Sequence, residues 1–314
     1  MLGGSGFVGS ALVARLANAG HRVKVLSRNP ARARQLAVLP TVEIVRANVH
    51  QGAVLSRELA SCDVAINLIG ILNEPGRSGS GFMAAHAELA RTLVDAAVRN
   101  DVARLLQMSS LGADAKLGPS HYLRSKGIAE DHVRAAPASL DYTIFRPSVI
   151  FGPGDSLLNR FAGLLRLTGG VLPLARPDAR FQPIYVDDVV EAFVRALPGG
   201  ATSRQSYELG GPEIVSLQQL VEFTAQTIGV RPRILRLPDG IARLQGWVMD
   251  FIPGKPFSSD NYRSLSVDSV CSDDGCARLG IKPQSLQAIV PGYLGPGTRG
   301  SRMDRYRAAA RRST

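Results

Sequence analysis

The stretch that decides the fold is Gly3-Gly4-Ser5-Gly6-Phe7-Val8-Gly9, near the beginning of the chain. A turn with glycine at every third position lets the backbone approach a bound pyrophosphate closely. An amphipathic segment follows from Phe7, and Gly20 ends it before the β-branched run at residues 22–26. A helix beginning there directs unpaired N–H groups and its positive dipole end at phosphate charge. Glycines, helix and strand in this order predict a dinucleotide site rather than a ligand-free tight turn. The predicted phosphate contacts are Gly3, Ser5, Gly6, Phe7 and Val8.

The glycine turn normally follows an apolar strand at the centre of a sheet. Here only Met1 and Leu2 precede it. We therefore expect the natural chain to begin several residues upstream, which an intact-mass measurement of the native protein would test.

Length and composition are those of an ordinary globular protein, with 314 residues, 45% hydrophobic and 20% charged. Cys62, Cys271 and Cys276 are odd in number and lack metal-ligand spacing, so we predict a reducing compartment and no disulfide framework. The apolar run at residues 64–72 is too short to span a bilayer, and no signal peptide is visible. We predict a cytoplasmic protein, peripheral at most to the inner face of the membrane.

The formal net charge is +11, and arginines crowd the tail. A solvated, disordered tail over residues 295–314 is the prediction, and an electrostatic contact with an anionic membrane or partner is the alternative. Nucleic acid is not expected as a partner, because no aromatic residues interleave with the charges.

Strand and helix patterns alternate through the first half, with a helix at residues 83–98. This alternation predicts an α/β protein with a Rossmann-type, doubly wound parallel sheet. The expected strands are residues 22–26, 42–46, 64–68, 105–108 and 142–146.

After Pro147 glycine and proline become frequent. A strand at residues 181–186 leads into a helix capped by Asp187 or Asp188, and Ser216 caps another helix reaching Ile228. We predict a dinucleotide-binding domain over residues 1–180, to which residues 181–212 return. A smaller, interleaved α/β substrate domain is predicted over residues 150–294.

An apolar stripe at helical spacing follows in this second half. We expect it to pack on the core. The alternatives are that it lines a pocket for an apolar substrate or rests on a membrane surface. The stripe comprises Ile241, Leu244, Trp247, Val248, Phe251 and Ile252.

Cofactor choice depends on the end of the strand at residues 22–26, because NAD-selective sites usually place an acid at the corresponding position. This chain has Ser27-Arg28 there, with Arg32 and Arg34 close behind. A guanidinium suits a 2′-phosphate, so we favour NADP(H) over NAD(H), with Arg28 as main contact and Ser27 as a second donor. The alternative is that these arginines are merely solvated. By position, Asn48 and Val49 lie beside the adenine, and the turn containing Leu68, Ile69 and Gly70 runs under the adenosine and ribose.

The candidate chemistry lies in Tyr122-Leu123-Arg124-Ser125-Lys126, where the i, i+4 spacing puts phenol and ammonium on one helix face. A nearby cation lowers a tyrosine pKa, and such a phenol can exchange the proton that accompanies hydride transfer at a carbonyl. Lys126 can also hold the nicotinamide ribose. Ser109 and Ser110 follow the expected strand at residues 105–108, at the sheet edge where ligands bind. One of the two hydroxyls can hold the substrate oxygen. A chance pairing of Tyr and Lys is the alternative.

The histidines His50, His86, His121 and His132 are scattered and suggest no metal site. His121 adjoins Tyr122 and can tune a substrate contact, although surface solvation is the simpler interpretation.

The glycine turn, the strand-end serines, Tyr122 with Lys126, and the run from Arg146 to Gly152 together resemble an extended or atypical short-chain dehydrogenase/reductase. Within that superfamily, residues 121–126, 181–189 and 279–283 resemble the nucleotide-binding accessory subunit of respiratory complex I and its bacterial relatives.

The superfamily resemblance implies a proton-transfer pair, Tyr122 and Lys126, with Ser109 or Ser110 as third member and Pro147-Ser148 beside the nicotinamide. The narrower resemblance implies a structural NADPH and docking on a membrane complex near its quinone region. Leu111-Gly112-Ala113 replaces the Tyr-Gly of the extended enzymes, which counts against sugar-nucleotide chemistry.

Two functions therefore remain open. One is hydride transfer between a nicotinamide and a carbonyl, alcohol or quinone-like substrate, with Tyr122 as acid/base. The other is a non-catalytic, NADPH-stabilised accessory or assembly protein associated with complex I.

Overall fold

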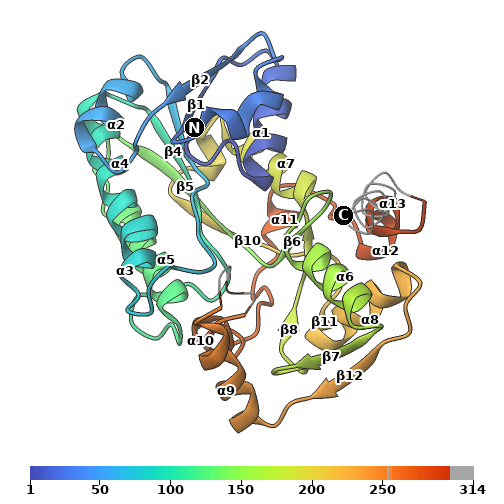
Figure 1. Ribbon diagram of the computed structural model, residues 1–314. Helices are drawn as coiled ribbons and strands as arrows, with labels where there is room; N and C mark the ends of the chain where they lie inside the picture. The colour runs from blue at the N-terminus through green and yellow to red at the C-terminus, as the bar shows by residue number, and fades with distance from the viewer. Residues whose placement is uncertain (253–254, 256, 298–314) are drawn as a thin grey trace.

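A computed structural model describes residues 1–252, 255 and 257–297 of the chain. An upper lobe holds the main sheet and the N-terminus, and a lower lobe holds most of the second half of the chain (Figure 1). The predicted basic tail, residues 295–314, lies almost entirely outside the described residues, which end at Gly297.

The main sheet is parallel throughout, which confirms the predicted doubly wound α/β class. One group of strands runs in the order β10-β5-β4-β3, and β1 pairs with β2 beside it. Leu2 joins the two groups, because it bridges to Asn67 of β3 on one side and to Leu26 of β1 on the other. Its N–H donates to Ile66 O at 2.8 Å, and Leu26 N donates to Met1 O at 3.0 Å. The strands are β1 (Val23–Ser27), β2 (Val42–Arg46), β3 (Val64–Asn67), β4 (Arg104–Met108), β5 (Asp141–Pro147) and β10 (Gln205–Leu209).

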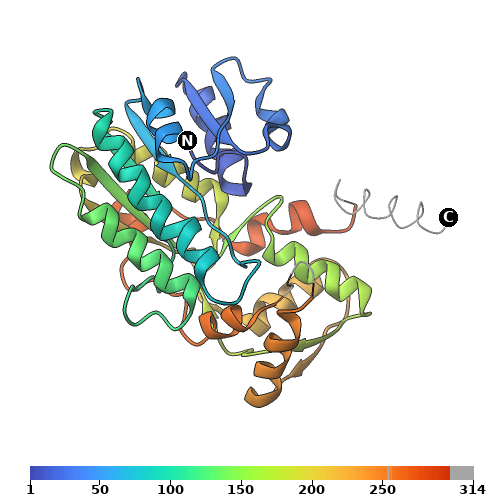
Figure 2. The same cartoon turned by 60° about the vertical axis from the view of Figure 1, so that its left-hand side comes forward.

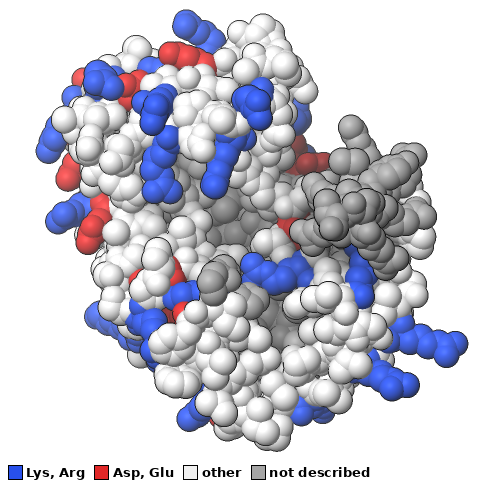
Figure 3. All heavy atoms as spheres, viewed as in Figure 1, with Lys and Arg blue, Asp and Glu red and all other residues white. Residues whose placement is uncertain are grey.

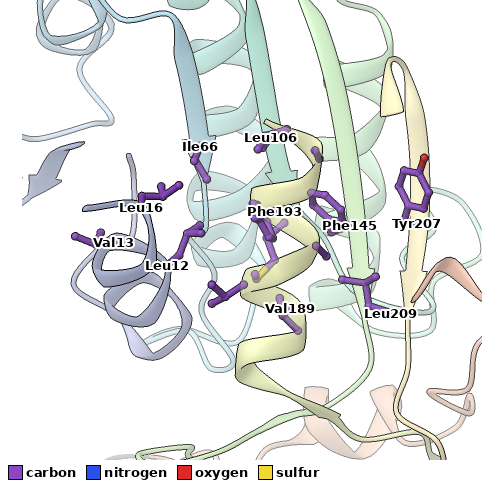
Figure 4. Packing of buried hydrophobic residues seen from close by; sticks show 14 of the residues in the cluster. Leu12, Val13, Leu16, Ile66, Leu106, Phe145, Val189, Phe193, Tyr207 and Leu209 are labelled. Atoms are coloured by element: carbon purple, nitrogen blue, oxygen red, sulfur yellow. The ribbon is translucent and has the colours of Figure 1, made fainter. Parts of the chain in front are cut away.

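Helices cover both faces of this sheet, as a doubly wound sheet requires. On one face, α1 (Phe7–Asn18) packs against α7 (Val186–Ala196). Leu12 and Leu16 of α1 meet Phe193 of α7 and Phe145 of the sheet in a buried cluster (Figure 4). The opposite face carries α2 (Gly52–Leu59), α4 (Leu89–Arg99) and α5 (His121–Arg134), of which α4 and α5 lie in front in the turned view (Figure 2).

The predicted helix at residues 83–98 is present but does not begin as an α-helix. A short α3 (Ser80–Phe82) runs into a π-helical segment, η2 (Met83–Glu88), before α4. A π-segment carries an extra residue per turn and is found mostly at functional sites. This one places His86 on the buried side.

The predicted strand at residues 181–186 is wrong. Pro183 lacks an N–H, and the chain changes partners around it, because β8 (Arg180–Phe181) pairs with β11 (Val215–Ser216) while β9 (Ile184–Tyr185) pairs with β6 (Ile150–Phe151). The predicted caps are also wrong. Helix α7 begins at Val186 with Tyr185 as its N-cap, and Asp187 and Asp188 lie inside its first turn. The Asp188 carboxylate instead accepts from Gln284 N at 2.8 Å.

The lower lobe is built around α6 (Leu157–Leu167), α8 (Leu217–Thr227) and the parallel pair β7 (Val171–Leu174) and β12 (Arg233–Arg236). Ser216 caps α8 as predicted, accepting from Gln219 N at 3.1 Å, while Gln219 Oε1 accepts from Ser216 N at 2.7 Å. The remaining elements are η1 (Pro30–Leu36), η3 (Gly200–Thr202), α9 (Asp239–Met249), α10 (Ser259–Ser264), α11 (Gly275–Arg278), α12 (Leu286–Ile289) and α13 (Pro291–Leu294).

We propose that the chain is divided into a domain over residues 1–180 and an interleaved domain over residues 150–294. The segment at residues 181–212 runs back to the main sheet, because β10 pairs with β5.

The apolar stripe on α9 does not pack on the core, and that prediction is wrong. Its six side chains are 43–61% exposed. Ala242 and Gly246, on the opposite side of the helix, are buried instead. Within the described residues, no helix has the length and apolarity to cross a membrane.

Candidate active site

The glycine turn has the shape that a phosphate cradle needs. Gly3 has φ +76°, and Gly6 N donates to Gly3 O at 3.0 Å. A Cβ on Gly9 would lie 2.2 Å from Gly3 O, so the first turn of α1 packs directly on the glycine turn. Helix α1 has no side-chain cap and no acidic residue in its first turn. Its N-terminus is therefore free of competing negative charge, and the turn fits a pyrophosphate.

A second turn, following β3, packs against the first. Asn67 Oδ1 accepts from Ile69 N at 3.1 Å and holds this turn in shape. A Cβ on Gly3 would lie 3.0 Å from the carbonyl carbon of Leu68, so the two turns touch backbone to backbone. The structure thus brings the predicted phosphate contacts together with Leu68 and Ile69.

Lys126 connects this second turn to the end of β4. Its Nζ lies 3.2 Å from Met108 O and 3.5 Å from Ile69 O. A Cβ on Gly70 would stand 3.2 Å from the same Nζ, so the ammonium packs closely against the backbone of this turn. Burial lowers the Lys126 pKa to about 8, against the opposing effect of Glu130.

Helix α5 carries both Tyr122 and Lys126, as the sequence predicts. Ser120 caps it by accepting from Leu123 N at 3.1 Å. The Asp260 carboxylate, from α10, accepts from His121 N at 2.7 Å and Tyr122 N at 3.1 Å. A carboxylate stabilises a helix N-terminus, so the lower lobe fixes the start of the helix that presents the phenol.

The Tyr122 ring is held by two aromatic neighbours. Phe82 and His86 both meet it edge to face, with ring centroids 6.0 and 5.5 Å away. Burial raises the Tyr122 pKa, and the Ser110 hydroxyl acts in the opposite direction. The expected lowering of this pKa by Lys126 is therefore wrong, because desolvation of the phenolate dominates. Tyr122 is therefore a neutral phenol.

His86 is a site residue that sequence reasoning missed. Ile71 N donates to its Nε2 at 3.1 Å, and its Nδ1 lies 2.8 Å from Ser125 Oγ, which in turn donates to Tyr122 O. The ring is thus neutral with its proton on Nδ1, and burial lowers its pKa to about 2. His86 ties the turn after β3 to the helix that carries Tyr122. Its place on the buried stripe that includes Leu89 and Leu93 is the signal that could have revealed it.

Ser109 and Ser110 follow β4 at the edge of the sheet. Ser109 N donates to Phe145 O at 2.7 Å, which fixes the backbone there. Both side-chain hydroxyls are buried, and neither makes a hydrogen bond of full geometry within the described part of the chain, although the Ser110 hydroxyl lies close enough to the Tyr122 phenol to lower its pKa. Buried hydroxyls are normally paired, so this pair fits a bound oxygen supplied from outside the protein.

The adenosine end of the predicted site is more open. Ser27 is buried and its Oγ accepts from Asn29 N at 3.2 Å, whereas Arg28 is exposed. Arg28 contributes, after burial, to lowering the His50 pKa, so it lies near the turn in which Asn48 Oδ1 accepts from His50 N at 3.3 Å. Val49 is buried beneath that turn. Lys and Arg side chains gather over this lobe, above a hollow between the two lobes (Figure 3).

Known proteins match the chain over these same segments. Residues 3–156 match the NAD(P)H-binding family, and residues 114–211 match the 3-beta hydroxysteroid dehydrogenase/isomerase family. A relative in Arabidopsis thaliana is the mitochondrial NADH dehydrogenase [ubiquinone] 1 alpha subcomplex subunit 9. It is 31% identical over 94% of this chain and 76% of its own length. The chain belongs to the atypical short-chain dehydrogenase/reductases. Its sequence resemblance to that superfamily and to the complex I accessory subunit is confirmed.

Other members of this short-chain dehydrogenase/reductase group are similar as well. The ceramide reductase of Caulobacter vibrioides is 33% identical over 76% of this chain and 72% of its own length. Among solved structures, the dTDP-glucose 4,6-dehydratase DesIV of Streptomyces venezuelae superposes with a TM-score of 0.75 at 22% identity. It covers 97% of this chain and 96% of its own. At that identity the likeness extends to the fold alone.

Pro147 ends β5, and Ser148 follows it at the sheet edge expected to lie beside a nicotinamide. The Ser148 hydroxyl donates to Ser269 O at 2.7 Å and accepts from Gln182 N at 3.1 Å. That side chain is committed within the protein, and so is much of the local backbone, because Ser148 N donates to Leu209 O at 2.9 Å and Pro147 O accepts from Leu111 N at 3.0 Å.

A pocket of about 160 Å³ lies between the chain after β3 and the helices α9 and α10, lined in part by Phe82, His121 and Trp247. It reaches the aromatic packing around Tyr122 through Phe82. No group of three or more metal-ligating side chains occurs among residues 1–252, 255 and 257–297.

Proposed function

We propose that this protein is an NADP(H)-dependent oxidoreductase that reduces a carbonyl or quinone-like substrate, with Tyr122 as the proton donor. The observation that carries the proposal is the convergence at one place of a neutral phenol, a buried ammonium and two buried hydroxyls. Acid/base groups of this kind, beside a nucleotide cradle, are what carbonyl reduction needs.

Each residue then has a role of its own. Bound NADPH supplies the hydride to the carbonyl carbon. The Tyr122 hydroxyl gives its proton to the developing alkoxide, so that an alcohol leaves and the phenolate remains. The Ser110 hydroxyl stabilises that phenolate, and the ammonium of Lys126 binds the ribose hydroxyls. The Ser109 and Ser110 hydroxyls donate to the substrate oxygen, and His86 fixes the turn and helix that present these groups.

Turnover tests this proposal directly. The purified chain is mixed with NADPH and a panel of ketones, aldehydes and quinones, and loss of the absorbance of reduced nicotinamide is followed. Consumption that depends on one substrate class supports the proposal. A panel without any consumption, with NADPH bound, would leave the non-catalytic function in its place.

Arg28 is expected to select NADPH. Replacing it with alanine removes a charged hydrogen bond to the 2′-phosphate, and NADPH affinity should fall by about 10- to 100-fold, while NADH affinity stays the same. Calorimetric titration measures both. Arg231→Ala, an exposed arginine in the lower lobe, is the matched control and should change neither value. Equal affinities of the unaltered chain for NADPH and NADH would contradict the assignment.

The pH dependence of NADPH affinity should report Lys126. Its pKa of about 8 means that the ammonium is charged below that pH and loses its proton above it. Affinity should therefore be constant below about pH 8 and weaken above it, while the Tyr122 phenol, whose pKa is raised, stays protonated. Lys126→Met should bind more weakly at low pH and show no weakening above pH 8. A Lys126→Met variant that keeps the alkaline weakening would assign it to another group.

A second function has a specific observation in its favour. The Arabidopsis relative that aligns with 94% of the chain is named as a subunit of NADH dehydrogenase. We therefore also propose, as the alternative, an NADPH-stabilised accessory protein of a respiratory complex. Cofactor that co-purifies without exchanging, recovery in the membrane fraction and absence of turnover would favour it over the reductase.

A further inference from the structure

Helix α9 has its large apolar side chains on the exposed face and its small residues on the buried face. A surface helix normally buries its large apolar side chains and exposes its polar ones. Here Ala242 is 1% exposed and Gly246 is buried against α10, where a Cβ would lie 3.3 Å from Ser259 Cα. These two small residues let α9 approach α10 closely. The large apolar side chains Ile241, Leu244, Trp247 and Val248 of the helix are consequently turned outward.

The outward side chains form one continuous apolar stripe over α9 and the turn that follows. Single exposed apolar residues are normal on a protein surface, but a contiguous group marks an interaction site. The Trp247 and Phe251 rings meet edge to face at 5.3 Å, which shows that the stripe is continuous. The exposed fractions are 53% for Ile241, 57% for Leu244, 50% for Trp247, 46% for Val248, 61% for Phe251 and 43% for Ile252.

The charge beside the stripe is mainly positive. Residues 231–263 contain six Lys and Arg against three Asp and no Glu. Two of those three acids present little surface to a partner, because the Asp250 side chain is 6% exposed and Asp260 is 9% exposed. Arg243, whose side chain is 68% exposed on α9 itself, pairs with Asp239 at 3.1 Å, and Arg77, whose guanidinium lies 4.9 Å above the Phe251 ring, pairs with Asp250 at 3.6 Å. Lys and Arg still outnumber the acids of residues 231–263 two to one.

We propose that α9 docks this protein on an anionic phospholipid bilayer, with the helix lying along the surface. The apolar stripe enters the boundary between headgroups and acyl chains, Trp247 and Phe251 occupy that boundary, and the arginines contact lipid phosphates. The helix has 11 residues, far fewer than a bilayer span requires. A second copy of the chain is the poorer partner, because pairing the two stripes would bring the positive flanks together. This proposal does not depend on the proposed reductase function.

The chain offers a direct probe, because Trp247 is its single tryptophan. The full chain is mixed with vesicles of phosphatidylglycerol and phosphatidylcholine, or of phosphatidylcholine alone. With anionic vesicles we expect Trp247 emission to shift to the blue, brominated acyl chains to quench it, and the protein to sediment with the vesicles. Added salt should weaken this binding, because the lipid charge is screened.

Variants separate the stripe from non-specific attraction. Leu244→Glu combined with Phe251→Glu should lower the vesicle partition coefficient by about tenfold or more, because apolar burial is lost and charge repulsion added. Both side chains are more than half exposed, so the fold should be kept, which circular dichroism checks. Leu167→Glu, at an 83% exposed leucine outside α9, is the matched control and should bind like the unaltered chain.

Two results would overturn the proposal. One is Trp247 emission that anionic vesicles leave unchanged. The other is emission already shifted to the blue in buffer, together with a dimer in sedimentation velocity that the double variant dissociates, which would assign the stripe to a second copy.

Discussion

Replacing Tyr122 with phenylalanine is expected to lower the turnover number by about 10²- to 10⁴-fold, the usual contribution of a positioned general acid. The substitution removes only the hydroxyl. The ring contacts with Phe82 and His86 remain, so the fold and the position of the ring should be kept. NADPH affinity should be unchanged, because the cradle and Lys126 are untouched. Steady-state rates and calorimetric titration give the two values separately.

Tyr207→Phe is the matched control for this experiment. Tyr207 is also buried, and its hydroxyl donates to Ala201 O at 3.5 Å and interacts with the Arg278 side chain, away from the glycine turn. Its turnover should equal that of the unaltered protein. Full activity in Tyr122→Phe would mean that another group donates the proton, and the role given to Tyr122 would be lost.

Replacing Gly9 with alanine should weaken NADPH binding by about 10²-fold or more, comparable to the cost of a 1 Å displacement at a site. The new Cβ would stand 2.2 Å from Gly3 O and 2.7 Å from Gly4 Cα, which are backbone atoms that cannot rotate away. The glycine turn must shift, and its N–H groups then leave the pyrophosphate. Equilibrium titration measures the loss, and thermal unfolding checks that the variant is folded.

Two further glycines make this test decisive. At Gly6 a Cβ would meet Gly3 O at 3.2 Å, so Gly6→Ala should bind NADPH with intermediate affinity even if Gly9→Ala unfolds. Gly163, inside α6, has open space around its Cβ position, and Gly163→Ala should bind normally and be more stable by about 0.5–1 kcal/mol. Unaltered NADPH affinity in Gly9→Ala would remove the turn from the binding site.

The sequence pattern alone predicted those parts of the site whose structure depends on residues close together in the sequence. The turn at Gly3 and the helix from Phe7 follow from adjacent residues, and the shared face of Tyr122 and Lys126 follows from helical spacing alone. The parallel sheet follows from the alternation of strand and helix patterns. In each case the sequence signal and the tertiary structure have the same physical cause.

Features that depend on distant contacts could not be predicted in this way. The role of His86 depends on Ser125, 39 residues away, and on a π-segment that shifts its register. Pro183 broke a predicted strand because its two halves have different partners. The direction of the Tyr122 pKa shift depends on burial, which spacing does not report.

The orientation of the apolar stripe on α9 also could not be predicted from the sequence pattern. Periodicity establishes that one face of the helix is apolar, but not whether that face is turned inward. Ala242 and Gly246 decide the orientation, because they alone are small enough for the contact with α10.

The central claim is that the glycine turn and the Tyr122–Lys126 helix form one nucleotide site. Calorimetric titration of the purified chain with NADPH tests it most directly. The account predicts one NADPH bound per chain, with higher affinity than NADH. Absence of measurable binding by either nucleotide, with the protein folded, would contradict it.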